Sequence, residues 1–254
     1  MLVRRGFEPC VAPLDLPFDA DLPEADAARI AAHLEHYAFR LFFRGAILRP
    51  DGFFPADATR FLAPERALAA AESLASLGLA ERLPDGRYRL LRPASSFGGT
   101  LEWFIARQLR VRYALDAVAG VQFRAAGVGG DLDVLASAEG KLIAVEVKSS
   151  PPKHLGAAEV GAFFERIRAL RPDLAIFAMD TALRLSDRVI PLFTAVLEDR
   201  ARRNPRPVPP PRRVERELWA ITPHVYVVNA KPNLIGNLGR ALAEGLFALA
   251  PEPP

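Results

Sequence analysis

The first third of the chain has an apolar pattern that predicts helices followed by a β-hairpin. From Glu24 to about Arg44, apolar residues recur every three or four positions, which indicates an amphipathic helix. Pro55–Phe61 is typical of a short helix. Pro64–Gly78 is typical of a longer one, because proline suits the first helical position and glycine the end. Residues 79–91, LAERLPDGRYRLL, alternate around a Pro-Asp-Gly turn and predict a hairpin.

Beyond residue 98 the pattern changes to alternating helices and strands. Helices are expected over 100–118, 156–170, 186–202 and 233–249, and strands over 120–125, 131–137, 141–149, 174–180 and 218–230. This order predicts an α/β domain with a mixed sheet.

These patterns divide the chain into three expected parts. Residues 1–23 combine acids and prolines without a period, which indicates an irregular N-terminal arm. Residues 24–93 form the helix-and-hairpin part, and residues 94–254 form the α/β domain. Within the latter, the basic, proline-rich run at 200–216 is expected to be a loop.

Composition narrows the class of protein. Half of the residues are hydrophobic and a quarter are charged, as in soluble globular proteins. No apolar run is long enough to span a bilayer, and the first residues lack the apolar core of a signal peptide, so a cytoplasmic location is expected. The single cysteine excludes an internal disulfide and a multi-cysteine zinc site. A formal net charge of +3 suits a nucleic-acid partner.

The stretch from Gly129 to Ser150, GGDLDVLASAEGKLIAVEVKSS, places charged residues inside two predicted strands. If Glu139 and Gly140 are the two loop residues of a hairpin, Asp133 faces Glu146 and Asp131 faces Lys148. Opposed residues point to the same side of a sheet, and alternate residues share a side. All four polar side chains then form one patch, while the valines and leucines between them face a core.

Two opposed carboxylates repel one another, so a cation between them is expected. Magnesium accepts one or two carboxylates and completes its shell with water and phosphate oxygens. Such an ion activates water and neutralises charge on a phosphodiester, and a nearby ammonium group stabilises the anionic transition state. Only four of the 33 basic residues are lysines, and Lys148 is one of them. A compact, flexible charge therefore suits this position better than the planar fork of arginine.

This stretch resembles the core of the PD-(D/E)XK nuclease superfamily, the restriction-endonuclease-like fold. The resemblance covers residues 98–180 and matches Asp133 to the acid of the second strand and Glu146 and Lys148 to the Glu-X-Lys of the third. It implies that Asp133 and Glu146 bind Mg²⁺ or Mn²⁺ and that Lys148 acts in catalysis. An acid on the preceding helix is frequent in the family, and Glu102 matches it. The family's proline is replaced by Leu132, which leaves Asp131 as a rival metal ligand.

Residues 24–92 resemble a winged helix-turn-helix domain in the order and length of their elements. The resemblance implies that the helix at 64–77 lies in a DNA groove and that Arg82, Arg87 and Arg89 contact phosphates. Lys153 is a further candidate for phosphate contact. The polar residues of that helix are poorly suited to reading bases, so contact with a partner protein or with a second copy of the chain is an equal alternative.

The sequence therefore predicts a metal-dependent nuclease, endo- or exonucleolytic, that acts on DNA. Two alternatives stay open. One is a nucleic-acid-binding protein whose nuclease-like site is catalytically silent. The other is a winged-helix protein that binds a partner, with the α/β domain as its scaffold.

Overall fold

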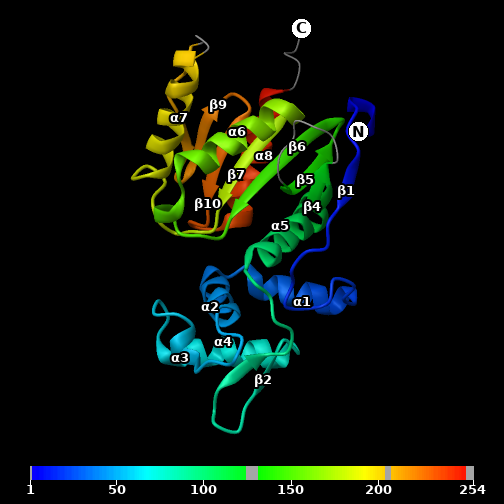
Figure 1. Ribbon diagram of the computed structural model, residues 1–254, viewed down its shortest axis with the longest axis vertical. Helices are drawn as coiled ribbons and strands as arrows, with labels where there is room; N and C mark the ends of the chain where they lie inside the picture. The colour runs from blue at the N-terminus through cyan, green and yellow to red at the C-terminus, as the bar shows by residue number, and fades with distance from the viewer. Residues whose placement is uncertain (1, 124–130, 204–206, 250–254) are drawn as a thin grey trace. The chain divides into compact units, whose positions relative to one another are not determined.

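The computed structural model describes residues 2–123, 131–203 and 207–249 (Figure 1). The chain folds into two compact units. The larger unit contains residues 1–12 and 105–254, and the smaller contains residues 13–104. The division passes within helix α5 (Gly98–Tyr113), so that one helix contributes to both. Among the described residues, no helix is both long enough and apolar enough to cross a membrane.

The larger unit is built on a mixed sheet with the strand order β1-β4-β5-β6-β7-β10-β9-β8. Neighbouring strands are antiparallel except at β6–β7 and β7–β10, which are parallel. The strands are β1 (Pro9–Val11), β4 (Asp116–Phe123), β5 (Leu132–Ala138), β6 (Lys141–Lys148), β7 (Leu174–Met179), β8 (Arg212–Glu215), β9 (Leu218–Thr222) and β10 (Val225–Asn229). The α/β class and the mixed sheet predicted from the sequence are both present.

Helices α6 (Ala157–Leu170) and α7 (Val189–Arg203) cover one face of this sheet. Their phenylalanines pack with Phe177 and Met179 of β7 in one apolar core. Helix α8 (Leu234–Ala248) contacts β7 and β10 and covers the opposite face, behind the sheet in Figure 1. Because side chains alternate along a strand, β7 supplies apolar residues to both layers and is buried throughout.

The smaller unit has the predicted order of helices and then a hairpin. Its elements are α1 (Glu24–Leu34), α2 (Tyr37–Ile47), α3 (Pro55–Ala58), α4 (Pro64–Ser76), β2 (Ala80–Arg82) and β3 (Tyr88–Leu90). The helix expected over 24–44 is divided at His36, whose backbone is extended. The buried guanidinium of Arg40 donates to the carbonyl oxygens of Leu34 and Glu35, at 2.6 and 3.1 Å, and so satisfies the end of α1. Membership of the winged-helix family stays a prediction.

The structure differs from the expected elements mainly at edges and turns. Residues 1–23 are not wholly irregular, because Val3–Arg5 forms a 3-10 turn and β1 pairs with β4. The run at 200–216 is not all loop, because β8 lies within it. Edge strands need backbone pairing on one side only, so they form without an apolar pattern. Helix α5 ends at Tyr113 because Ala114 adopts a left-handed conformation, with φ 53°.

Candidate active site

The β5–β6 hairpin has the register expected from the sequence. Val134 pairs with Val145 and Ala138 pairs with Lys141, around a two-residue loop. That loop is Glu139-Gly140, with φ values of 50° and 75°. Two residues with positive φ are what a type I′ turn requires, so the local sequence fixes the register. Continued by one residue, this register places Asp133 opposite Glu146.

At Asp133 the backbone pairing of β5 with β6 ends, and a side-chain hydrogen bond replaces it. The Asp133 carboxylate accepts the backbone N–H of Val147 at 2.6 Å, through Oδ2. The pairing expected between Asp131 and Lys148 is absent from the described ladder, because Asp131 precedes β5 and is exposed. A hydrogen bond to the side chain of Asp133 thus satisfies the Val147 amide that a longer ladder would use. Asp133, and not Asp131, is built into the hairpin.

The charged residues lie on the face of the sheet that α6 and α7 cover. In the β6–β7 ladder, Glu146 is level with Phe177 and Lys148 is level with Met179. Residues paired across a ladder point to the same side, and both of these β7 residues belong to the apolar core beneath the two helices. Glu146 and Lys148 are therefore charged residues at the border of an apolar layer. Glu146 is only 3% exposed.

Two cations flank the buried carboxylate of Glu146. Lys148 Nζ lies 2.8 Å from Oε1, and Arg166 Nη2 of α6 lies 2.6 Å from Oε2. Sequence reasoning missed Arg166, although a signal was present. Phe163, Arg166 and Leu170 have the spacing of one helix face, and the first and last of them are buried. A charge on the buried face of a helix indicates a buried partner.

Burial and the neighbouring carboxylate of Glu146 together raise the pKa of Asp133 to about 7. At Lys148, burial acts to lower the pKa, but the carboxylates of Glu146, Asp133 and Glu159 outweigh it and raise the pKa above its usual value. Lys148 therefore stays protonated at neutral pH and serves as a fixed positive charge and donor. It is not suited to act as a general base.

The oxygens of Asp133 and Glu146 fit a divalent cation. Both are hard donors of the kind that Mg²⁺ prefers, and their mutual repulsion favours a positive charge between them. Glu146 Oε2 and Arg166 Nε are buried, and within the described part of the chain neither has a directed hydrogen-bond partner. The short contact of that oxygen with Arg166 is an ion pair without hydrogen-bond geometry, so Oε2 keeps acceptor capacity.

The other expected acids do not complete a three-acid cluster. Among the described residues, no group of three His, Cys, Asp or Glu side chains converges as a metal site. Glu102 lies on α5 in the unit of residues 13–104, and its part in the site stays a prediction. Because α5 begins at Gly98, Glu102 follows the first turn and does not lie within it. Two carboxylates still suit Mg²⁺, which takes its remaining ligands from water and phosphate.

Of the residues expected to contact phosphates, some are paired with acidic side chains in the structure. Arg87 pairs with Asp85 at 2.7 Å and Arg89 with Glu81 at 2.6 Å, both within the β2–β3 hairpin. Arg82 and Lys153 are exposed. The two paired arginines carry compensating acids, so their attraction for a phosphate is weaker than the sequence suggests.

Comparisons with known proteins give similarity in structure only. No family model matches the sequence, and no curated protein matches it. A crystal structure of protein VC1899 from Vibrio cholerae is 14% identical, with a TM-score of 0.49 over 97% of this chain and 60% of that one. Can2 from Sulfobacillus thermosulfidooxidans, solved in complex with cyclic tetra-adenylate, is 15% identical, with a TM-score of 0.47 over 96% and 59%. At these values neither likeness establishes what this chain binds or does.

Proposed function

We propose that this protein is a metal-dependent nuclease that hydrolyses phosphodiester bonds in DNA. The observation that carries the proposal is the meeting of Asp133, Glu146 and Lys148 at the end of the β5–β6 hairpin, with Lys148 Nζ 2.8 Å from Glu146. An ammonium group beside two carboxylates is more than the neutralisation of buried Glu146 requires, since Arg166 already pairs with that carboxylate. It matches the needs of phosphodiester hydrolysis.

Each residue has a separate task in this proposal. Asp133 and Glu146 hold Mg²⁺ or Mn²⁺, and Glu102 supports the metal or its water ligands. When bound, the ion supplies charge neutralisation at the phosphate and a water of lowered pKa. Lys148 stabilises the charge that develops on the phosphate and orients the attacking water. Arg166 fixes the orientation of Glu146 through their contact of 2.6 Å.

A catalytically silent site is the second candidate, and one observation favours it. Lys148 and Arg166 already neutralise Glu146, which removes part of the attraction for a metal. The protein would then bind nucleic acid without cutting it, or bind a partner through the smaller unit, for which we propose a winged-helix function. Cleavage separates the nuclease from both alternatives, and salt-dependent retention on DNA separates those two from each other.

A direct test is to incubate the pure protein with linear, circular, single-stranded and branched DNA, and with RNA, in Mg²⁺, Mn²⁺ or EDTA. We expect cleavage of at least one DNA substrate that requires metal. An Asp133→Asn sample purified in parallel controls for contaminating nucleases. Equal cleavage by both samples, or none by the wild type on any substrate, would contradict the nuclease proposal.

Binding to duplex DNA should depend strongly on salt and weakly on sequence. In this proposal Arg82, Arg87, Arg89 and Lys153 contact phosphates, and phosphate contacts carry no sequence information. Each contact contributes about 0.9 to the slope of log affinity against log salt. Fluorescence anisotropy in EDTA, on two duplexes of unrelated sequence, measures this. A strong preference for one short sequence at moderate salt would instead make α4 a reader of bases.

A further inference from the structure

A basic hollow of about 540 Å³ lies at the loops that follow β7 and β10 and at the β8–β9 turn. Its charged lining consists of Arg184, Arg213, Arg216, Lys231 and one carboxylate, Glu217. Glu217 is nearly buried, and its Oε2 accepts the backbone N–H of Leu185 at 2.8 Å, so this acid serves the loop structure. The hollow therefore has a strong excess of positive charge.

Three of these cations are free to bind a ligand. Within the described part of the chain, the side chains of Arg184, Arg216 and Lys231 have no hydrogen-bond or ion-pair partner, and all three are exposed. Arg213 is held in place, because Nε donates to the Arg216 carbonyl oxygen at 2.5 Å and the guanidinium lies over the Trp219 ring. Many other arginines of this unit are ion-paired, for example Arg200, Arg212 and Arg240.

Buried asparagine side chains form hydrogen bonds with two of the loops that carry these cations. Asn229 Nδ2, at the end of β10, donates to the carbonyl oxygen of Leu183 in the loop after β7, at 2.6 Å. Asn237 Nδ2 of α8 donates to the carbonyl oxygen of Lys231 at 2.9 Å. Both asparagines are buried. These buried hydrogen bonds fix the backbone of the two loops that carry Arg184 and Lys231 before any ligand arrives.

The backbone of Arg216 adds a second sign of function. Its φ is 38°, a left-handed conformation that glycine or asparagine adopts at lower cost. The same turn contains a register shift between Arg213 and Glu215 in the β8–β9 ladder. Strained backbone and bulges of this kind occur where a side chain must be aimed at a site.

The hollow and the candidate active site share one edge of the sheet. Strands β6, β7 and β10 are parallel, and their ends are level, since Lys148 pairs with Met179 and Met179 pairs with Asn229. Ligands of α/β sheets bind outside the carboxyl ends of such strands. Two strand spacings separate β6 from β10, which is about 10 Å. At about 3.4 Å of helix axis per phosphate of one strand, this distance corresponds to about three nucleotides measured along the axis of a duplex.

We propose that Arg184, Arg216 and Lys231, together with Arg213, bind a backbone phosphate of the nucleic-acid strand whose scissile bond lies at Lys148. The assignment of a nucleic acid rests on the proposed function, whereas the affinity of the hollow for phosphate rests on its charges alone. The hollow would hold the strand a few nucleotides from the cut, and so fix its path across the sheet edge.

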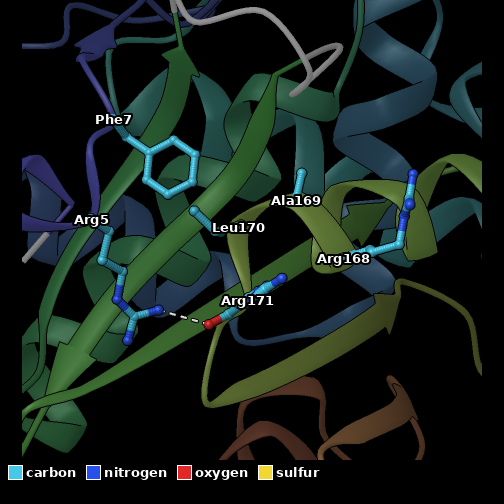
Figure 2. A pocket seen from close by; sticks show the side chains of 6 residues that line it. All are labelled: Arg5, Phe7, Arg168, Ala169, Leu170 and Arg171. Atoms are coloured by element: carbon cyan, nitrogen blue, oxygen red, sulfur yellow. Dashed lines mark hydrogen bonds between the residues drawn. The ribbon is translucent and has the colours of Figure 1, made fainter.

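In a second arginine-lined hollow, of about 690 Å³, two of the three arginines are ion-paired, and the left-handed backbone of the third, Arg171, caps the end of α6 (Figure 2). There Arg5 pairs with Asp173 at 3.2 Å and Arg168 pairs with Glu165 at 2.7 Å. Figure 2 shows Arg5 reaching the carbonyl oxygen of Arg171, with Arg168 on the far side of the hollow. This hollow lies at the carboxyl end of α6, where cations offset the negative end of the helix. It provides matched control residues.

The test compares two triple variants with the same loss of charge. One is Arg184→Gln, Arg216→Gln and Lys231→Gln. The control is Arg168→Gln, Arg171→Gln and Arg203→Gln. The first two residues line the second hollow, and Arg203 is an arginine at the end of α7 that pairs with Asp199. Binding to labelled single-stranded and duplex DNA is measured in EDTA over a range of salt, so that no cleavage is needed. We expect the first variant to bind at least about tenfold more weakly, with a salt slope lower by about 1, and the control to lose much less.

Additional measurements distinguish a nucleic-acid strand from free phosphate as the ligand, and distinguish failure of this proposal from failure of the nuclease proposal. Inorganic phosphate and a mononucleotide are added as competitors, and we expect each to compete only at millimolar concentration. Equal loss of binding in both variants would overturn the proposal, and so would tight binding of a mononucleotide without binding of a strand. Failure of wild-type cleavage, with the expected difference in binding, would remove the nuclease function and leave the phosphate site standing. Normal cleavage with equal binding would remove only the phosphate site.

Discussion

Lys148→Ala should lower cleavage at least about a hundredfold, because loss of one preorganised charge at a transition state has effects of that size. Its ammonium group lies 2.8 Å from Glu146 and keeps its proton, since neighbouring carboxylates raise its pKa. Binding of DNA should change far less than the cleavage rate, because the charge acts mainly where the transition state is more negative than the substrate. Single-turnover cleavage and binding in EDTA measure the two effects separately.

Two further variants sharpen this result. Lys148→Arg should not restore cleavage, because a planar guanidinium cannot reproduce a compact ammonium group at this position. Lys141→Ala is a matched control, since it removes the lysine at the other end of the same strand. It should cleave like the wild type. Near-wild-type cleavage by a folded Lys148→Ala sample would remove Lys148 from the mechanism.

The hairpin was predictable from the sequence because its determinants are local. Glu139-Gly140 selects a two-residue turn, and alternation of valine with charge sets the faces. Arg166 was not found, because its partner is on another element, twenty residues away, and only the helix face hinted at it. Strands β1 and β8 were not predicted from the sequence, because an edge strand is stabilised by backbone hydrogen bonds to a neighbouring strand.

The basic hollow shows the same limit more clearly. Its cations are Arg184 of the loop after β7, Arg213 and Arg216 of β8 and the turn that follows it, and Lys231 of the loop after β10, and none belongs to a motif. Only the fold brings the ends of β7 and β10 beside the β8–β9 turn. In the sequence, nothing distinguishes these arginines from the many others in the chain. Their lack of acidic partners within the described residues distinguishes them, and that property depends on three-dimensional placement.

Asp133→Asn should abolish cleavage and greatly reduce the response to metal without destabilising the metal-free protein. Burial and Glu146 raise the pKa of Asp133 to about 7 from 3.8. Between about pH 4 and pH 7 the folded state therefore holds a proton that the unfolded state has lost. The contribution of Asp133 to stability falls as pH rises through this window, and above it the two carboxylates repel one another. On cross-strand pair scales the repulsion costs up to about 1 kcal/mol.

Asparagine removes this repulsion and can still accept the N–H of Val147, which Asp133 Oδ2 accepts at 2.6 Å. At pH 8 without metal, the variant should melt no lower than the wild type, and it should show less loss of stability between pH 5 and pH 8. Adding Mg²⁺ or Mn²⁺ at pH 8 should raise the melting temperature of the wild type, since a ligand of the folded state stabilises it by mass action. The variant should gain much less.

Asp131→Asn is the matched control, because it removes an equal charge from an exposed residue just outside β5. It should keep both cleavage and the metal response. If the control lost them and Asp133→Asn kept them, Asp131 would be the ligand. Clear destabilisation of metal-free Asp133→Asn, together with no metal response in the wild type, would make Asp133 a structural hydrogen-bonding residue. The carboxylate pair would then serve the hairpin, and the proposal of a silent binding protein would replace that of a nuclease.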